Sequence, residues 1–171
     1  MVVLAKGMSG GIYPISATIL RTPLEAVFHP DPHIHISTSG GSEIGCRVAL
    51  KVLEITRAPG FLDHVNHLAE TFRKGVDQLI EKHGILKKLR QLGLFMGLEL
   101  EDALCGPILC KTAYDNGLFM VYANNDKTVT QFLPPLIMTT DEANDVLRRL
   151  DQALADAREL KQLLIQAGAR R

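Results

Sequence analysis

A single lysine, Lys6, stands between a short apolar run, Met1 to Ala5, and the glycine-containing turn GMSGG. The apolar run is too brief for a helix and predicts a buried strand, so Lys6 lies where that strand ends. Ligands of open α/β sheets bind at the carboxyl ends of strands, and glycines let a ligand approach the backbone. The spacing therefore predicts a site where a primary amine meets a cofactor or substrate. An isolated lysine is also compatible with an ordinary solvated charge.

A second polar stretch, HISTSGGSE, places Ser37, Thr38 and Ser39 ahead of a predicted helix. Hydroxyl donors next to backbone N–H groups at a helix N-terminus suit a phosphate group. The same pattern is also typical of an ordinary helix-capping turn, so these residues alone leave both interpretations open.

Composition limits the classes to which the chain can belong. Its 171 residues, 46% of them hydrophobic, can bury a substantial core in one domain or two small ones. Nineteen basic and nineteen acidic residues cancel, which gives no indication of a nucleic-acid or membrane partner. The N-terminus lacks the pattern of a signal peptide and no apolar run is long enough to span a bilayer, which predicts a cytoplasmic protein.

Cysteine and histidine positions give no indication of a metal centre. The three cysteines cannot all pair and show no metal-ligand spacing, which predicts reduced, buried thiols: Cys46, Cys105 and Cys110. A histidine-rich loop holds His29, Asp31, His33 and His35 without a fixed helical spacing. We therefore predict no metal site.

Strand-like and helix-like segments alternate along the chain, which predicts an α/β or α+β fold. Residues 12–20 are β-branched and strand-like, and residues 43–56 have the apolar spacing of an amphipathic helix. Pro59-Gly60 ends that helix. We place a domain boundary there, between residues 1–59 and residues 60–171.

The second domain is predicted to lay helices on a small sheet. An apolar stripe predicts a helix that starts at Phe61 and ends near Gly84. Thr139 and Glu142 form a capping-box pattern before a long final helix. The remaining predicted elements are strands at 92–101, 118–123 and 128–137, and a helix at about 107–116.

Three motifs in this order resemble the class III pyridoxal-phosphate-dependent aminotransferases, the group that contains ornithine and acetylornithine aminotransferases. VVLAKGMSGGIYPISATIL resembles the lysine segment of the family, and HISTSGGSEIGCRVAL resembles its His-x-x-Thr-x-x-Gly segment with the helix that follows. FLPPLIMTTDEANDVL resembles the carboxylate-site strand and the final helix. The resemblance extends from residue 1 to about residue 155. It implies the PLP-dependent transferase fold of type I, with the end of the large domain followed by the small α/β C-terminal domain.

The resemblance also implies roles for individual residues. Lys6 matches the lysine that forms the internal aldimine, a Schiff base, with pyridoxal 5'-phosphate. That lysine also moves the proton while an amino group passes from an amine or amino acid donor to a keto acid. Thr38 matches the threonine that reaches the cofactor phosphate of the neighbouring subunit, which implies a homodimer, with Ser37 and Ser39 beside the phosphate. His35 matches the histidine of the same motif.

One departure from the family pattern concerns the substrate. Many relatives place an arginine shortly before the Pro-Pro-Leu segment to pair with the substrate α-carboxylate, whereas this chain has Gln131. A neutral amide cannot form the bidentate charged pair, which favours a donor whose amine is terminal. The family also includes aminomutases and a decarboxylase, so the type of reaction rests on the resemblance and not on Lys6 alone.

A second departure concerns completeness. In the family, an aspartate that pairs with the pyridine nitrogen, an aromatic residue that stacks on the ring and a glycine-bearing phosphate loop all precede the lysine segment. This sequence has no counterpart of that part, so it resembles the C-terminal two fifths of such an enzyme. The alternative function is therefore a non-catalytic fragment or domain that does not retain the cofactor and associates with itself.

Overall fold

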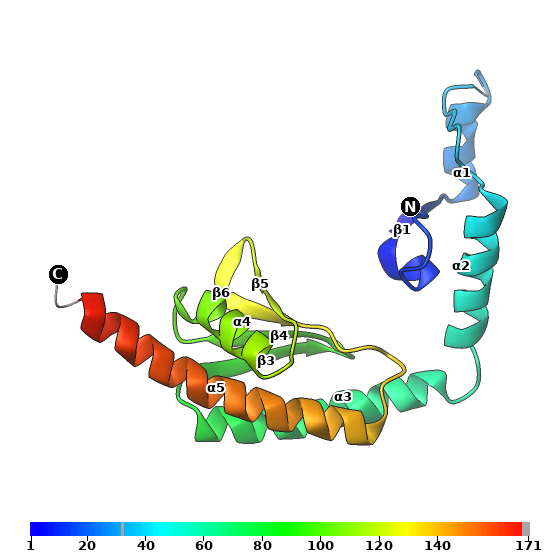
Figure 1. The fold of residues 1–171 in the computed structure, drawn as a ribbon. Coiled ribbons are helices and arrows are strands. Elements are labelled where there is room, and N and C mark those ends of the chain that lie inside the picture. Colours follow the sequence, from blue (N-terminus) through cyan, green and yellow to red (C-terminus); the bar gives the residue numbers. More distant parts are fainter. Residues whose placement is uncertain (32, 169–171) are drawn as a thin grey trace. The chain divides into compact units, whose positions relative to one another are not determined.

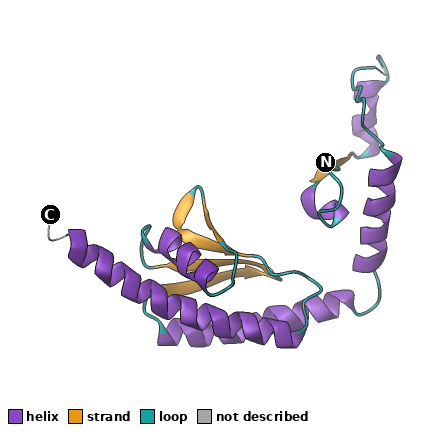
Figure 2. Ribbon diagram, viewed as in Figure 1, coloured by secondary structure: helices purple, strands orange, loops and turns teal. Residues whose placement is uncertain are grey.

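The computed structural model describes residues 1–31 and 33–168 (Figure 1). The chain divides into two compact units, Met1–Leu62 and a second unit that starts at Asp63. Each unit is described by itself. Helices and strands alternate along the sequence, and both are present in the structure (Figure 2), so the predicted mixed α/β class is confirmed.

The first unit combines a small β-ribbon with helices. Strands β1 and β2 pair in antiparallel register, with Val2 opposite Ile19 and Leu4 opposite Ala17. Its elements in chain order are β1 (Val2–Leu4), the 3-10 helix η1 (Lys6–Ser9), β2 (Ala17–Ile19), α1 (Thr22–Glu25), the 3-10 helix η2 (Ala26–Phe28) and α2 (Glu43–Thr56). The helix predicted over residues 43–56 is confirmed.

Two predictions for the ribbon are wrong. The strand expected to be buried, β1, is exposed at every residue, because two strands of three residues cannot enclose a face of the ribbon. The second strand covers only Ala17–Ile19 and not all of residues 12–20. Pro14 has no N–H for a strand ladder, and β1 offers three pairing partners.

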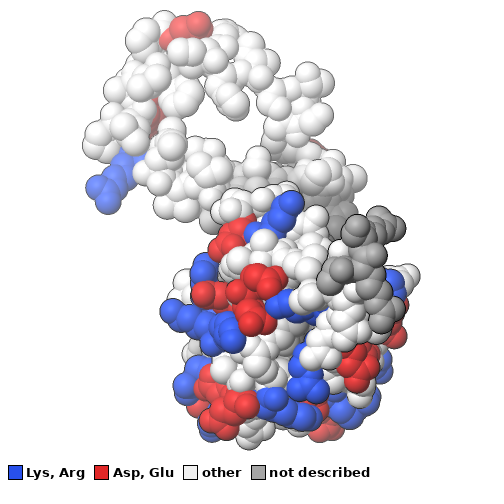
Figure 3. Space-filling model, turned by 90° about the vertical axis from the view of Figure 1, so that its left-hand side faces the viewer, with Lys and Arg blue, Asp and Glu red and all other residues white. Residues whose placement is uncertain are grey.

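The first unit has very little core. Among its described residues, only Ser9, Gly45 and Ala49 are buried. Large apolar side chains remain in contact with solvent, among them Val3 (62% exposed) and Leu50 (61% exposed). On the face seen in Figure 3 this unit is mostly white, whereas blue and red residues alternate over the second unit. An exposed apolar surface of this extent is typical of a surface that another polypeptide covers.

The second unit is a four-stranded antiparallel sheet covered on one face by helices (Figures 1 and 2). The strand order is β3-β4-β6-β5. On the covered face the rings of Phe72 and Phe132 meet edge to face, with centroids 5.2 Å apart. The elements are α3 (Phe61–Lys82), β3 (Leu86–Leu92), β4 (Phe95–Leu100), α4 (Cys105–Asp115), β5 (Val121–Ala123), β6 (Asp126–Phe132) and α5 (Thr140–Gly168).

The helices of this unit pack through small residues and a continuous apolar stripe. Leu150, Ala153 and Leu154 of α5 are fully buried. The Thr112 hydroxyl of α4 donates a hydrogen bond of 2.8 Å to the carbonyl of Ala153, which ties the two helices together. The predicted capping box is confirmed: the backbone N–H of Thr139 donates to Glu142 Oε2 at 2.7 Å, and the N–H of Glu142 donates to Thr139 Oγ1 at 3.2 Å.

Strand β3 was absent from the sequence prediction. Its sequence, LKKLRQL, has apolar residues every third position, which imitates a helix. The strand lies at the edge of the sheet, where charged side chains protect the free backbone edge. The predicted strands at 92–101, 118–123 and 128–137 exist, with the bounds given above for β4, β5 and β6.

The thiols differ in their burial. All three cysteines are free, but only Cys105 is buried, and Cys46 and Cys110 are half-buried. The prediction of buried thiols is therefore wrong for Cys46 and Cys110.

Within the described part of the chain, no helix has both the length and the apolar character that crossing a membrane requires.

A half-buried ion pair links α5 to the segment before α4. Lys161 Nζ lies 2.6 Å from Asp102 Oδ2 and 2.8 Å from Glu101 Oε2, and the Lys161 side chain is 14% exposed. The hydrogen bond from Lys161 lowers the pKa of Asp102 to about 2. The ordinary pKa of an aspartate is about 3.9, so this pair stabilises the fold above that pH.

We expect Lys161→Met to lower the free energy of unfolding at neutral pH by about 1 kcal/mol, an amount reduced by the partial exposure of Asp102. In the parent chain this stabilisation is lost as the pH falls from about 4 to about 2, so the variant should lose less stability than the parent over that range. Urea unfolding followed by circular dichroism measures both effects. Lys111→Met, which removes an exposed pair with Asp115, is the control. Equal pH profiles for parent and Lys161→Met would contradict this role.

Candidate active site

Lys6 lies at the junction between β1 and η1 and has a strained backbone. Its φ is +57°, and among the described residues it is the one non-glycine residue with a positive φ. L-residues adopt this left-handed conformation at a cost of about 1 kcal/mol or more, and such residues gather at functional sites. The side chain is exposed to solvent. The strain is therefore a reason, independent of any motif, to consider Lys6 functional.

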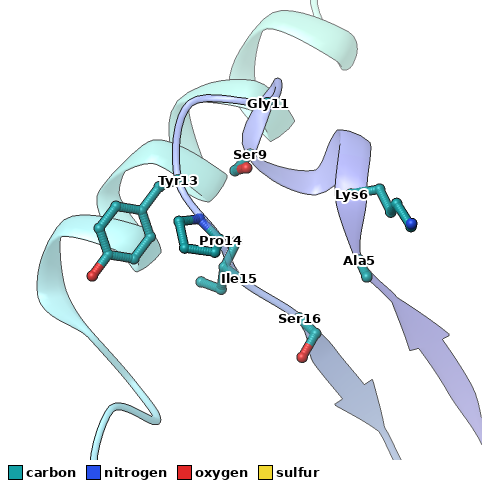
Figure 4. A pocket seen from close by; sticks show the side chains of 8 residues that line it. All are labelled: Ala5, Lys6, Ser9, Gly11, Tyr13, Pro14, Ile15 and Ser16. Carbon is teal, nitrogen blue, oxygen red and sulfur yellow. The ribbon is translucent and has the colours of Figure 1, made fainter.

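The segment that carries Lys6 borders an open hollow of about 640 Å³. Residues 5–16 supply its lining, and Figure 4 shows that Lys6 and Tyr13 lie on opposite sides of this loop. The Lys6 amine points outward from the loop in that view. Ser9, in η1, is 2% exposed. The amine is therefore open to a reaction partner, while the backbone beneath it is held in place.

Tyr13 attaches this segment to helix α2. A Cβ atom at Gly45 would lie 2.9 Å from two ring carbons of Tyr13, so only glycine admits the ring at this point of the helix. The Tyr13 hydroxyl also forms a hydrogen bond of 2.9 Å with the hydroxyl of Ser42. The sequence analysis did not identify Tyr13 as part of the site. The position of Tyr13, two residues after the Gly10-Gly11 pair, was the feature of the sequence that could have indicated its role.

Ser37, Thr38 and Ser39 lie in the loop before α2, and all three are exposed. Gly40 and Gly41 follow them in a turn, and Gly41 has a φ of +70°. A Cβ at Gly40 would lie 2.9 Å from the Cβ of Ser37, so the glycine allows the turn to close tightly. These hydroxyls therefore project from a compact, glycine-containing turn.

Ser37, Thr38 and Ser39 are not among the residues that line the Lys6 hollow. Gln131 belongs to the second unit, where it lies on β6 opposite Gly97 of β4 and lines a different hollow.

Among the described residues, no three ligand atoms of the histidine-rich loop converge. The N–H of His33 donates to Asp31 Oδ1 at 2.9 Å, which is a local turn contact between exposed residues. The one described group with converging metal-ligand atoms is Glu101, Asp102 and Cys105. The ammonium of Lys161 already lies against both carboxylates of that group and compensates their charge.

The chemistry available at Lys6 is that of an exposed primary amine. A lysine amine can attack an aldehyde carbon and can accept and return a proton. Hydroxyl groups on a glycine-containing turn can donate hydrogen bonds to phosphate oxygens. Both groups fit pyridoxal 5'-phosphate, which carries an aldehyde and a phosphate.

Comparison with known proteins defines the class. A sequence model of the family described as "Aminotransferase class-III" matches residues 1–154. The chain therefore belongs to the class-III aminotransferase family. The enzymes of this family depend on pyridoxal phosphate, which is the predicted cofactor.

Individual relatives agree with this assignment. The chain is 40% identical over 164 residues to an uncharacterized aminotransferase of Archaeoglobus fulgidus, a match that covers 96% of this chain and 39% of the relative. It is 35% identical to the acetylornithine aminotransferase of Caldanaerobacter subterraneus, over 92% of this chain and 38% of that protein. The chain thus spans about two fifths of the length of these relatives.

Solved structures confirm the predicted fold. The acetylornithine aminotransferase of Elizabethkingia anophelis matches with a TM-score of 0.80 and 27% identity, over 90% of this chain and 40% of that one. The ornithine aminotransferase of Toxoplasma gondii, whose active site holds PLP at partial occupancy, matches with a TM-score of 0.82 and 27% identity. That match covers 94% of this chain and 37% of the other. The fold is that of the PLP-dependent aminotransferases.

We expect Gly45→Ala to loosen the Lys6 segment. Alanine is favoured over glycine inside a helix by about 1 kcal/mol, but the added Cβ would force the Tyr13 ring away from α2. Hydrogen exchange followed by mass spectrometry should show faster exchange at residues 5–16, by about fivefold or more. Tyr13→Phe, which removes only the hydroxyl bond to Ser42, is the control and should change exchange much less. Unchanged exchange in Gly45→Ala would show that this contact does not hold the segment.

Proposed function

We propose that this chain is the C-terminal part of an aminotransferase that moves an amino group from an amine or amino acid donor to a keto acid, with Lys6 as the cofactor-binding lysine. The observation that carries the proposal is the strained, exposed Lys6 beside its hollow, in a chain of the class-III family. A strained backbone at an exposed lysine is unexpected for a solvated surface charge, because it costs stability without forming a contact.

The residues of this chain have distinct tasks in that reaction. When bound, the cofactor supplies an aldehyde for covalent attachment and a ring that accepts electrons. Lys6 Nζ holds the cofactor by that attachment and, once free, accepts the proton from the substrate carbon and returns it. Thr38, with Ser37 and Ser39, donates hydrogen bonds to a phosphate group.

The phosphate group that Thr38 serves is proposed to be the one in the second subunit of a homodimer. Two observations support this proposal: Thr38 is exposed on its turn, and it does not line the hollow beside Lys6 of its own chain. In such a dimer each copy completes the site of the other, so a complete site requires both copies. The three free cysteines fit a reducing compartment such as the cytoplasm.

We further propose that residues 1–59 form the end of the large cofactor-binding domain and residues 60–171 the small C-terminal domain. The sparse core of the first unit supports this division, because a domain that lacks most of its polypeptide cannot enclose its apolar side chains. The second unit has its own sheet, helices and buried core.

A second candidate function follows from the same sparse core. A chain whose first unit buries so few side chains could fail to retain the cofactor and act only as a non-catalytic fragment or domain. The two candidates differ in one measurable property, which is selective covalent capture of the cofactor at Lys6.

We expect Lys6 to be modified selectively when the purified chain is incubated with pyridoxal phosphate and reduced with sodium borohydride. The selectivity arises because Lys6 alone combines the strained backbone with an adjacent hollow. Peptide mapping by mass spectrometry locates the adduct. Lys6→Ala should abolish it, whereas Lys51→Ala, which removes an exposed lysine of α2, should leave it unchanged. Adducts spread equally over surface lysines would support the non-catalytic fragment instead.

Gln131 is proposed to decide how a substrate carboxylate is received. We expect Gln131→Arg to bind a 2-oxo dicarboxylate about fivefold or more tightly than the parent chain, because a guanidinium forms a charged pair that an amide cannot. Isothermal titration calorimetry measures the affinity, and Gln131→Leu is the control of similar size without the charge. If the arginine variant binds no better than the leucine variant, this position does not govern carboxylate recognition.

A further inference from the structure

The exposed face of the sheet in the second unit contains a hollow of about 650 Å³. Successive side chains along a strand alternate between the two faces of the sheet, so Met96 and Leu98 are buried under the helices while Gly97 faces the other side. Arg90 of β3 and Gln131 of β6 lie directly opposite Gly97 on either side. Gly97 therefore leaves a gap between the side chains of Arg90 and Gln131 in the row that crosses the sheet.

Gly97 lines the hollow, and its lack of a side chain leaves space there. A Cβ there would lie 3.0 Å from Val129 Cγ1 and 3.9 Å from the Cβ of Arg90. The backbone of Gly97 does not have a positive φ. The glycine is thus needed for space and not for an unusual backbone conformation.

The rim of the hollow is apolar. Leu92 is 82% exposed, Phe95 is 73% exposed and Leu133 is 51% exposed, and all three line the hollow. Apolar side chains that converge on a concavity with a few polar groups are typical of a small-molecule site. The amide of Gln131, opposite Gly97, supplies a donor and an acceptor of hydrogen bonds.

Charge at the hollow is compensated. Arg90 is the one charged residue among those that line it. Its Nε lies 2.9 Å from Glu99 Oε2 and its Nη1 lies 3.8 Å from Asp126 Oδ2, so one guanidinium faces two carboxylates. Hydrogen bonds from Thr128 are the main cause that lowers the pKa of Asp126, and the Arg90 charge adds to the effect.

Lys88 of β3 is a further cation near the hollow. It lies opposite Glu99 in the register of β3 and β4, and it does not line the hollow. Arg90 is thus the one cation that lines the hollow, and a carboxylate that entered would compete with Glu99 and Asp126 for its guanidinium. The desolvation of a carboxylate without a charged partner is costly.

We propose that the hollow over Gly97 binds the uncharged, apolar part of an amine substrate and disfavours a carboxylate at that position. The identification of the ligand as part of an amine substrate rests on the proposed aminotransferase function, whereas the selectivity follows from the hollow itself. The polar end of the bound group, an amide or a hydroxyl, hydrogen-bonds the Gln131 side chain, and its carbon chain contacts Phe95 and Leu133.

The test compares two probes of equal length, hexanamide and hexanoate, by NMR titration of the full ¹⁵N-labelled chain. Hexanamide should shift the amide signals of residues 90, 97 and 131 saturably and bind about threefold or more tightly than hexanoate. Gly97→Val should abolish this binding by filling the hollow, and Gly97→Ala should weaken it. Gly84→Ala is the matched control, because a Cβ at Gly84 meets no atom within 4 Å.

A charge variant makes the test specific. Glu99→Gln removes one partner of Arg90 and should reduce the preference for hexanamide over hexanoate. The proposal is overturned if hexanoate binds as tightly as hexanamide to the parent chain, if neither probe binds saturably, or if Gly97→Val binds as the parent does. The titration is repeated with Lys6→Ala, which should bind hexanamide unchanged. The hollow is thus tested separately from cofactor capture at Lys6, and either can fail alone.

Discussion

The contact between the Tyr13 ring and the backbone of Gly45 is the constraint on which the candidate active site depends. It holds the segment between β1 and β2 against α2, with the Tyr13 hydroxyl fixed to Ser42. Lys6 lies in that segment with a left-handed backbone. A residue keeps such a conformation only where its surroundings determine it more strongly than its own preference does. The aromatic contact on α2 is the described interaction that can supply this constraint.

The two units differ in how far they support themselves. The second unit encloses a continuous core between sheet and helices. The capping box at Thr139 bonds backbone N–H groups at the start of α5, and the Thr112 hydroxyl of α4 bonds the Ala153 carbonyl of α5. The first unit presents apolar residues of both ribbon and helix to solvent. The chain spans about two fifths of the relatives that it matches. In the proposed function, the additional polypeptide of those relatives corresponds to the part that covers this exposed apolar surface.

The two hollows have different chemistry. The hollow beside Lys6 adjoins a reactive amine and belongs to a segment with little charge. The hollow over Gly97 has an apolar rim, a neutral amide at Gln131 and an arginine that is already paired with Glu99. The local charges around the hollow over Gly97 therefore give little stabilisation to a carboxylate. Specificity in such a site comes from compensated charge and available space together.

The sequence by itself determined the family and the main helices and identified Lys6 as a candidate site residue, because local periodicity, capping residues and short motifs are properties of neighbouring residues. The helix over residues 43–56 and the capping box at Thr139 were predictable for this reason. Strand β3 was not, because its threefold apolar spacing imitates a helix and only pairing with β4 makes it a strand. The exposure of β1, the strain at Lys6 and the alignment of Arg90 with Gly97 and Gln131 were likewise decided by tertiary structure. Each depends on contacts between residues far apart in the chain, which spacing along the sequence does not encode.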